Sequence, residues 1–184
     1  MTMSASNPTT AETFASFEDA TQYLEKMCRV LGVRTLSYWS LTVIDGVPDQ
    51  VTWIATYDPA YMAHYMNAHT PLGDPAFEHL GEKPQVIDWS ELNAVDGTSE
   101  RITAQATRYG IAKHGLSYPF RDGTKRQIMF SVNVECCDED WPREKARVIG
   151  MFCGFAHAFH ARVRPLVDAR RAAQHIAAQS GRKQ

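Results

Sequence analysis

The sequence has little of what marks a membrane, secreted or strongly charged protein. No apolar run approaches the roughly 20 residues that a membrane-spanning helix needs. The first residues, MTMSASNPTTAETF, lack the basic flank and the apolar stretch of an export signal. The formal net charge is only −2, so no overall basic field draws the chain to nucleic acid or anionic lipid. We therefore expect a cytoplasmic protein without a membrane partner.

Cysteine is also scarce, and its spacing offers no disulfide framework. The chain has 4 cysteines and no C-x-x-C pair. A bridge between the adjacent Cys136 and Cys137 would be strained. We interpret all of them as reduced thiols, which suits a cytoplasmic protein: Cys28, Cys136, Cys137 and Cys153.

Motifs of common enzyme chemistries are missing as well. The chain has no glycine loop for phosphate, no nucleophile elbow and no H-E-x-x-H pair. His157 and His160 lie three residues apart on a predicted helix, a spacing that permits metal ligation, but no third ligand is evident nearby. We expect no enzymatic activity, no metal and no cofactor.

Local patterns predict helices around one core. A chain of 184 residues, 44% of them hydrophobic, can bury a core of its own. Apolar residues repeat at helical spacing over 17–31, after Ser16 as a cap and before Gly32 as a stop. A long helix is expected from about Trp141, with Pro142 near its start. Shorter helical pieces are expected at 59–69, 73–81 and 99–111.

Strand signals predict two hairpins. The runs TLSYWSLTVID and QVTWIATYD are joined by GVPD, which has the composition of a turn. A second pair of runs surrounds Asp122-Gly123 in HGLSYPFRDGTKRQIMFSVNVE. Helices flanking four or five antiparallel strands make an α+β layered fold. Because side chains alternate along a strand, Tyr57 shares a face with Trp53 and points to the interior.

One group of aromatic, hydroxyl and acidic side chains is costly for an ordinary core, because each buried polar group needs a partner. A small ligand would supply those partners in a largely apolar pocket. The alternative is that the tyrosines reach solvent and that Asp74 only caps the helix of PAFEHL. The group comprises Trp53, Tyr57, Tyr61, Tyr65, Asp74, Trp89 and Ser131.

The spacing within this group resembles the autoinducer-binding domain of LuxR-type quorum-sensing regulators. The resemblance covers about residues 17–165, and five of six signature positions match in type and spacing. Where the family has a tryptophan that binds the lactone carbonyl, this chain has Tyr61, a phenol that can still donate. The signature positions are Tyr61, Tyr65, Asp74-Pro75, Trp89 and Gly115.

The resemblance implies an α-β-α sandwich with a central antiparallel sheet of about five strands, and an N-acyl-homoserine lactone held between sheet and helices. Asp74 would accept the ligand's amide N–H, while Tyr57 and Ser131 would serve its acyl carbonyl. Tyr65 and Trp89 would pack around the head group. Weaker candidates for the acyl slot are Leu41, Val43, Trp53 and Met129.

The predicted organisation is a flexible N-terminus at 1–14, the binding domain at 15–165, and a tail or truncated linker at 166–184. Too few residues follow Arg164 for a helix-turn-helix domain, so we expect no sequence-specific DNA binding by this chain alone. We expect a homodimer, or a heterodimer with a LuxR-type regulator, through the long helix, where Met151 and Val163 fall outside the sheet-facing stripe.

Several functions remain open at this stage. The chain is either the sensor half of a longer regulator or a stand-alone LuxR-like protein that acts as an anti-activator by heterodimerisation. A PAS-like or GAF-like sensor of another small molecule shares the layered outline but not the Tyr, Asp-Pro and Trp spacing. A lactone-degrading enzyme is the weakest alternative, because the metal cluster or nucleophile that such chemistry uses is absent.

Overall fold

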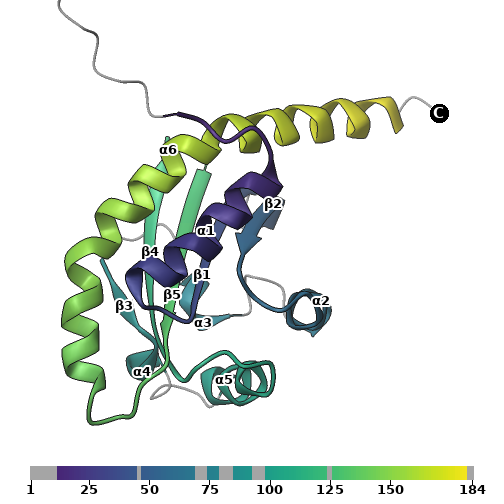
Figure 1. The fold of residues 1–184 in the computed structure, drawn as a ribbon. Coiled ribbons are helices and arrows are strands. Elements are labelled where there is room, and N and C mark those ends of the chain that lie inside the picture. The colour runs from purple at the N-terminus through teal and green to yellow at the C-terminus, as the bar shows by residue number, and fades with distance from the viewer. Residues whose placement is uncertain are drawn as a thin grey trace, which may run out of the picture.

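The computed structural model describes residues 12–44, 47–68, 74–78, 85–92, 98–123 and 126–181. Figure 1 shows a single sheet with helices on both of its faces, which is the expected α-β-α sandwich of the α+β class. The elements in chain order are α1 (Phe17–Leu31), β1 (Thr35–Ile44), β2 (Val47–Ala55), α2 (Pro59–Ala68), α3 (Pro75–Glu78), β3 (Ile87–Asp88), α4 (Trp89–Leu92), α5 (Thr98–Arg108), β4 (His114–Asp122), β5 (Arg126–Val134) and α6 (Trp141–Gly181).

The five strands form an antiparallel sheet in the order β2-β1-β5-β4-β3. The register of the inner strands pairs Ser37 of β1 with Ser131 of β5, and Ser131 with Ser117 of β4. Residues that are directly opposite one another point to the same face of a sheet. Three serines therefore lie in a row across the middle of the sheet, on one face.

Alternation along the strands divides the core into two layers. Leu36 and Tyr38 of β1 face α1 and α6, where they join a large cluster with buried residues of both helices such as Leu24 and Phe159. Trp39 points to the opposite face of the sheet, where residues of α2, α3 and α5 pack against it in a second cluster. The second layer is smaller and holds most of the predicted site residues.

The helix signals in the sequence are confirmed. The Oγ of Ser16 accepts a hydrogen bond from the backbone N of Asp19 at 3.0 Å, and Gly32 ends α1 with a φ of 62°. Pro59 opens α2, as expected for a residue without a backbone donor. Pro142 is likewise the second residue of α6.

The first hairpin differs from its prediction. The segment GVPD was expected to form the turn, but Val47, Pro48 and Asp49 belong to β2. The pairing of β1 with β2 shifts register between Thr42 and Val43, so an irregularity extends the ladder toward its tip. Periodicity alone does not reveal such a shift.

Helix α6 is longer than the predicted domain boundary at residue 165 allows. It continues through Pro165 to Gly181, and Figure 1 shows it curving between the part that covers the sheet and the part that projects from the body. A proline inside a helix removes one hydrogen bond and bends the axis. None of the helices in the described ranges is long and apolar enough to cross a membrane.

Two further expectations need correction. Phe14 was assigned to a flexible N-terminus, but its side chain is buried in the larger cluster and contacts the rings of Tyr23 and Phe159. Val163 was expected on a partner-facing side of the long helix, but it is fully buried within this chain. Both residues belong to the larger cluster, and the backbone N of Phe14 also donates to Arg162 O of α6 at 3.3 Å.

Candidate ligand-binding site

A cavity of about 710 Å³, a volume that includes open solvent at its mouth, lies in the second layer between the sheet and helices α2 to α5. Six residues that were predicted for the head-group site line it together: Tyr57, Tyr61, Tyr65, Asp74, Trp89 and Ser131.

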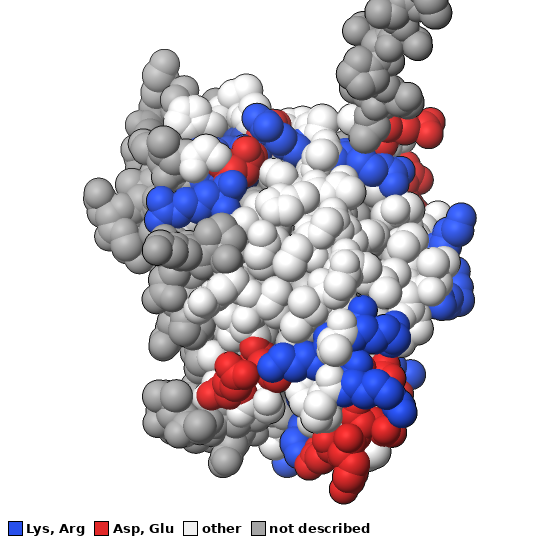
Figure 2. Space-filling model, turned by 90° about the vertical axis from the view of Figure 1, so that its left-hand side faces the viewer, with Lys and Arg blue, Asp and Glu red and all other residues white. Residues whose placement is uncertain are grey.

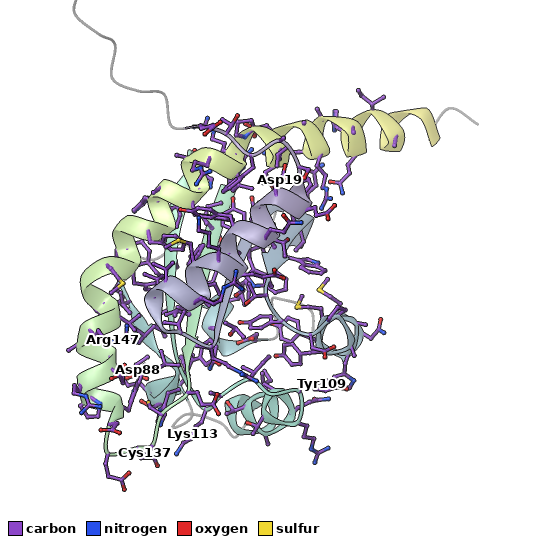
Figure 3. All side chains as sticks on the ribbon, viewed as in Figure 1. Asp19, Asp88, Tyr109, Lys113, Cys137 and Arg147 are labelled. Atoms are coloured by element: carbon purple, nitrogen blue, oxygen red, sulfur yellow. The ribbon has the colours of Figure 1, made fainter. Side chains whose placement is uncertain are left out.

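The three tyrosines form one wall of the cavity. Tyr61 and Tyr65 lie one turn apart on α2 with ring centroids 5.8 Å apart, and both are buried. Tyr57 precedes the helix and meets the Tyr61 ring edge-on at 5.5 Å. On the outer side, the half-exposed Tyr109, labelled in Figure 3, contacts the Tyr61 ring at 5.6 Å. The wall is thus packed as a unit.

Asp74 caps α3 and also lies in the wall of the cavity. Its Oδ1 accepts the backbone N–H of Ala76 at 2.9 Å, which caps α3. Its Oδ2 accepts the hydroxyl of Tyr65 at 2.8 Å. These bonds orient the carboxylate in the cavity wall, where its two oxygens offer about four acceptor positions in all.

Burial keeps the tyrosine hydroxyls protonated. It raises the pKa of Tyr57 to about 12, although the hydrogen bond with Ser37 lowers it somewhat. The pKa of Tyr61 is raised mainly by burial and to a smaller extent by the nearby Tyr57 and Asp74. The pKa of Tyr65 is raised by burial and by the neighbouring Asp74. All three side chains are therefore neutral hydrogen-bond donors at physiological pH.

The row of serines forms the floor of the cavity. The indole Nε1 of Trp89 donates to Ser117 Oγ at 2.9 Å, and Ser117 Oγ lies 2.8 Å from Ser131 Oγ. Ser37 Oγ lies 3.2 Å from the hydroxyl of Tyr57. Two hydroxyls joined by one hydrogen bond use only one of their two hydrogens. Each pair therefore keeps one hydroxyl hydrogen for another acceptor.

Trp89 is positioned by its neighbours in sequence and by β4. Its ring lies on the backbone of Gly115, where an added Cβ would be 2.4 Å from the ring atom Cε3. The preceding Asp88 is buried and accepts bonds from the backbone N and Oγ of Ser90, at 2.9 and 2.7 Å, and from Trp141 Nε1 at 3.1 Å. Lys145 Nζ lies 2.8 Å from the same carboxylate, and Figure 3 shows Asp88 beside the first turns of α6.

Three of the four residues predicted for the acyl slot, Leu41, Trp53 and Met129, are not among the described residues that line the cavity. Leu41 and Met129 are fully buried in the second cluster, and Trp53 is 37% exposed at its edge. The side chain of Val43 lies outside the described residues. At the place where the slot was expected, the wall is Trp39, whose ring contacts Phe77 at 5.6 Å.

Part of the cavity lining gives no signal in the sequence. Ser37, Ser117 and Trp39 were not singled out, because single serines or tryptophans in a strand give no local signal of their own. Apolar residues of α4, α5 and the segment after α5 complete the opposite side: Leu92, Ile102, Ala106 and Ile111. Among them only Ile102 and Ala106, four residues apart on a predicted helix, have the spacing of a buried helix face.

The structure also shows what the helical histidines contact. His160 Nδ1 lies 2.9 Å from the hydroxyl of Tyr38, and His157 Nε2 lies 3.2 Å from that of Tyr118. Burial lowers the pKa of His160, although the neighbouring Asp122 opposes this. Across the described part of the chain, no three His, Cys, Asp or Glu side chains gather in a group that could hold a metal ion.

The chain is similar in sequence and in fold to known proteins. The family model described as "Autoinducer binding domain" matches residues 16–163. Among solved structures, the chain is similar to CepR2 from Burkholderia cenocepacia, an N-acylhomoserine lactone dependent LuxR family transcription factor. The TM-score is 0.66 at 18% identity, over 82% of this chain and 86% of that one.

Two other solved structures share the fold at lower identity. SdiA in complex with octanoyl-rac-glycerol matches with a TM-score of 0.56 at 12% identity, over 83% of this chain and 61% of that one. The VqsR ligand-binding domain from Pseudomonas aeruginosa matches with a TM-score of 0.52 at 13% identity, over 80% and 86% of the two chains. A search of curated proteins gives no match.

Proposed function

We propose, since the chain belongs to the autoinducer binding domain family, that its cavity binds an N-acyl-homoserine lactone or a close analogue as the signal in quorum-sensing transcription control. The domain is a non-enzymatic ligand sensor of the LuxR type. The ligand would lie between the serine row and the tyrosine wall. Asp74 and Trp89 would hold its head group.

The observation that carries this proposal is the complementarity between the cavity's hydrogen bonding and an amide. An acyl amide offers one N–H donor and one carbonyl acceptor. The cavity presents the Asp74 carboxylate as an acceptor, and the spare hydrogens of the pairs Ser117–Ser131 and Ser37–Tyr57 as donors. A hydrogen bond to a charged group contributes about 1.5–3 kcal/mol.

Tyr61 extends this set toward the head group. Its hydroxyl makes no hydrogen bond with any residue in the described ranges, although the side chain is only 7% exposed. A lactone carbonyl at this position would accept from it. The ester oxygens of a glyceride offer similar acceptors, and octanoyl-rac-glycerol is the ligand that SdiA contains, so analogues of the lactone belong in the test.

Titration calorimetry with purified protein and a panel of acyl-homoserine lactones tests the proposal. Asp74→Ala should weaken binding by about 10- to 150-fold, because the ligand amide would be buried without an acceptor. Asp58→Ala is the matched control, since Asp58 Oδ1 caps α2 by accepting Ala60 N at 2.7 Å but is exposed and does not line the cavity. Equal affinities of wild type and Asp74→Ala would refute the assignment of Asp74.

Thermal unfolding gives a second readout. A ligand that binds only the native state stabilises it by about 2.7 kcal/mol when its free concentration is a hundred times the Kd. The melting temperature should therefore rise with ligand in the wild type and in Asp58→Ala, and much less in Asp74→Ala at the same concentration. If none of the lactones and glycerides tested changes the melting temperature, these compounds are excluded as ligands.

A further inference from the structure

We infer that Trp39 closes the end of the cavity along β1 and restricts the ligand to a compact molecule with a short acyl chain. This inference rests on the proposed function and concerns the length of the ligand that the same site accepts. Its basis is the position of one large side chain at the boundary of the cavity.

Trp39 lies in a row of large residues that runs parallel to the serine row. In the register of the sheet it is paired with Trp53 of β2 on one side and with Met129 of β5 on the other. Ser37, two residues earlier on the same face of β1, belongs to the cavity floor. One step along the strands, the floor thus changes from small hydroxyl side chains to bulky apolar ones.

Helices complete this barrier from above. The Trp39 ring contacts the Phe77 ring of α3 edge-on, with centroids 5.6 Å apart, and the Tyr65 ring of α2 at 5.8 Å. Trp39 is only 3% exposed. Within the described part of the chain, the indole therefore spans the layer between the sheet and these two helices.

The residues beyond the barrier are core. Leu41 follows Trp39 on the same face, and it and Met129 are fully buried without lining the cavity. An acyl chain that ran along β1 would have to displace the indole. The apolar lining away from Trp39 comes from α4, α5 and the segment after α5, including Ile102, Ala106 and Ile111.

A tryptophan is also buried when it only packs the core. The test therefore has to distinguish a change in the preferred acyl-chain length from a loss of folding stability. We would measure the affinities of butanoyl-, hexanoyl-, octanoyl-, decanoyl- and dodecanoyl-homoserine lactone for wild type, Trp39→Leu and Trp39→Ala. Trp53→Leu is the matched control, because Trp53 contacts Trp39 at 6.2 Å on the same face but does not line the cavity.

Wild type and Trp53→Leu should bind the butanoyl or hexanoyl compound best and lose affinity for the decanoyl and dodecanoyl compounds. In the Trp39 variants the tightest-binding lactone should have a longer acyl chain. Each added methylene that becomes buried should lower the Kd by up to about fourfold, which corresponds to about 0.8 kcal/mol. Trp39→Leu keeps part of the packing and serves if Trp39→Ala does not fold.

Each outcome has a distinct meaning. Tightest binding of dodecanoyl-homoserine lactone by wild type, or identical chain-length profiles in wild type and folded Trp39 variants, would overturn the inference while leaving the proposed function intact. Long-chain binding that appears only in the Trp39 variants would support it. Absence of lactone binding in wild type and in every variant would refute the proposed function and this inference with it.

Discussion

The indole of Trp89 rests directly on the backbone of Gly115, with no room for a side chain between them. A Cβ at position 115 would lie 2.4 Å from Cε3 and 2.5 Å from Cζ3 of the ring. Two residues further along β4, Ser117 accepts the indole N–H. The glycine is therefore required by space, and it sets how deeply the tryptophan enters the cavity wall.

Gly115→Ala should displace the Trp89 ring and break its bond to Ser117. We expect a loss of about 1–3 kcal/mol in the free energy of unfolding, as for other overpacked sites, together with weaker ligand binding. Urea unfolding followed by tryptophan fluorescence would measure it. Gly150→Ala is the control: a Cβ there meets nothing within 4 Å, so stability should stay the same or rise by up to about 1 kcal/mol. An equal change in the free energy of unfolding for Gly115→Ala and Gly150→Ala would contradict the close contact between Trp89 and Gly115.

Tyr61→Phe should weaken lactone binding by about 0.5–1.5 kcal/mol, the contribution of one neutral hydrogen bond. The ring remains, so its contacts with Tyr57 and Tyr65 are kept. Tyr61→Trp should be tolerated or should improve lactone recognition, because an indole N–H can take the place of the phenol. Calorimetry would compare the three proteins. Lactone affinity that Tyr61→Phe leaves unchanged would show that the hydroxyl does not contact the ligand.

Asp88 should make stability depend on pH in the acidic range. Burial alone would raise its pKa, but hydrogen bonds from Lys145, Ser90 and Trp141 prevail and lower it. The folded carboxyl then binds fewer protons than the unfolded one, whose pKa is about 3.9. Its contribution is therefore complete above about pH 4 and is lost as the pH falls through the folded pKa.

Asp88→Asn should accordingly destabilise the protein at pH 7, by about 1–3 kcal/mol for a buried charged acceptor, and by less at pH 3. Urea titrations at both pH values would measure the difference. Asp138→Asn is the comparison, since Asp138 bonds to Lys113 and His114 but is exposed, so its change at pH 7 should be smaller. A penalty for Asp88→Asn that is the same at both pH values would argue against a charged Asp88.

The outer side of α6 should mediate pairing of two chains, or of this chain with a LuxR-type relative. No Asp, Glu, Lys or Arg occurs from 148 to 161. Figure 2 shows a broad uncharged area on this side of the molecule, and Ile149 and Met151 are 37% and 38% exposed. Gly154 is exposed on the same side, and a Cβ there would meet nothing within 4 Å in this chain, so another chain can approach the helix closely.

Light scattering should thus show a dimer at micromolar concentration, and Met151→Asp should shift it to monomer. Val30→Asp is the matched control, because Val30 is a 65% exposed apolar residue that lies on α1 and not on α6. A monomeric wild type that also fails to bind a full-length LuxR-type relative would refute pairing.

Much of the fold and part of the cavity lining followed from local patterns. The caps at Ser16 and Gly32, the hairpin glycine at 123 and the alternation of the strands are signals within a few residues. Tyr61 and Tyr65 were predictable neighbours because they lie one helical turn apart. The spacing of Asp74 and Trp89 from these tyrosines resembles that of a known family, and this resemblance predicted that they lie in the same site. In the structure Asp74 immediately precedes α3, and Trp89 is the first residue of α4.

The rest depends on contacts between distant parts of the chain, which no local pattern encodes. The serine row exists because the register of the sheet brings residues 37, 117 and 131 together. Trp39 bounds the cavity in contact with Phe77 because β1 and α3 face each other across the layer. The sequence by itself determined which elements form and which residues could bind a ligand. Only tertiary packing decided the shape and length of the cavity, because free volume is what remains after large side chains from separate elements have met.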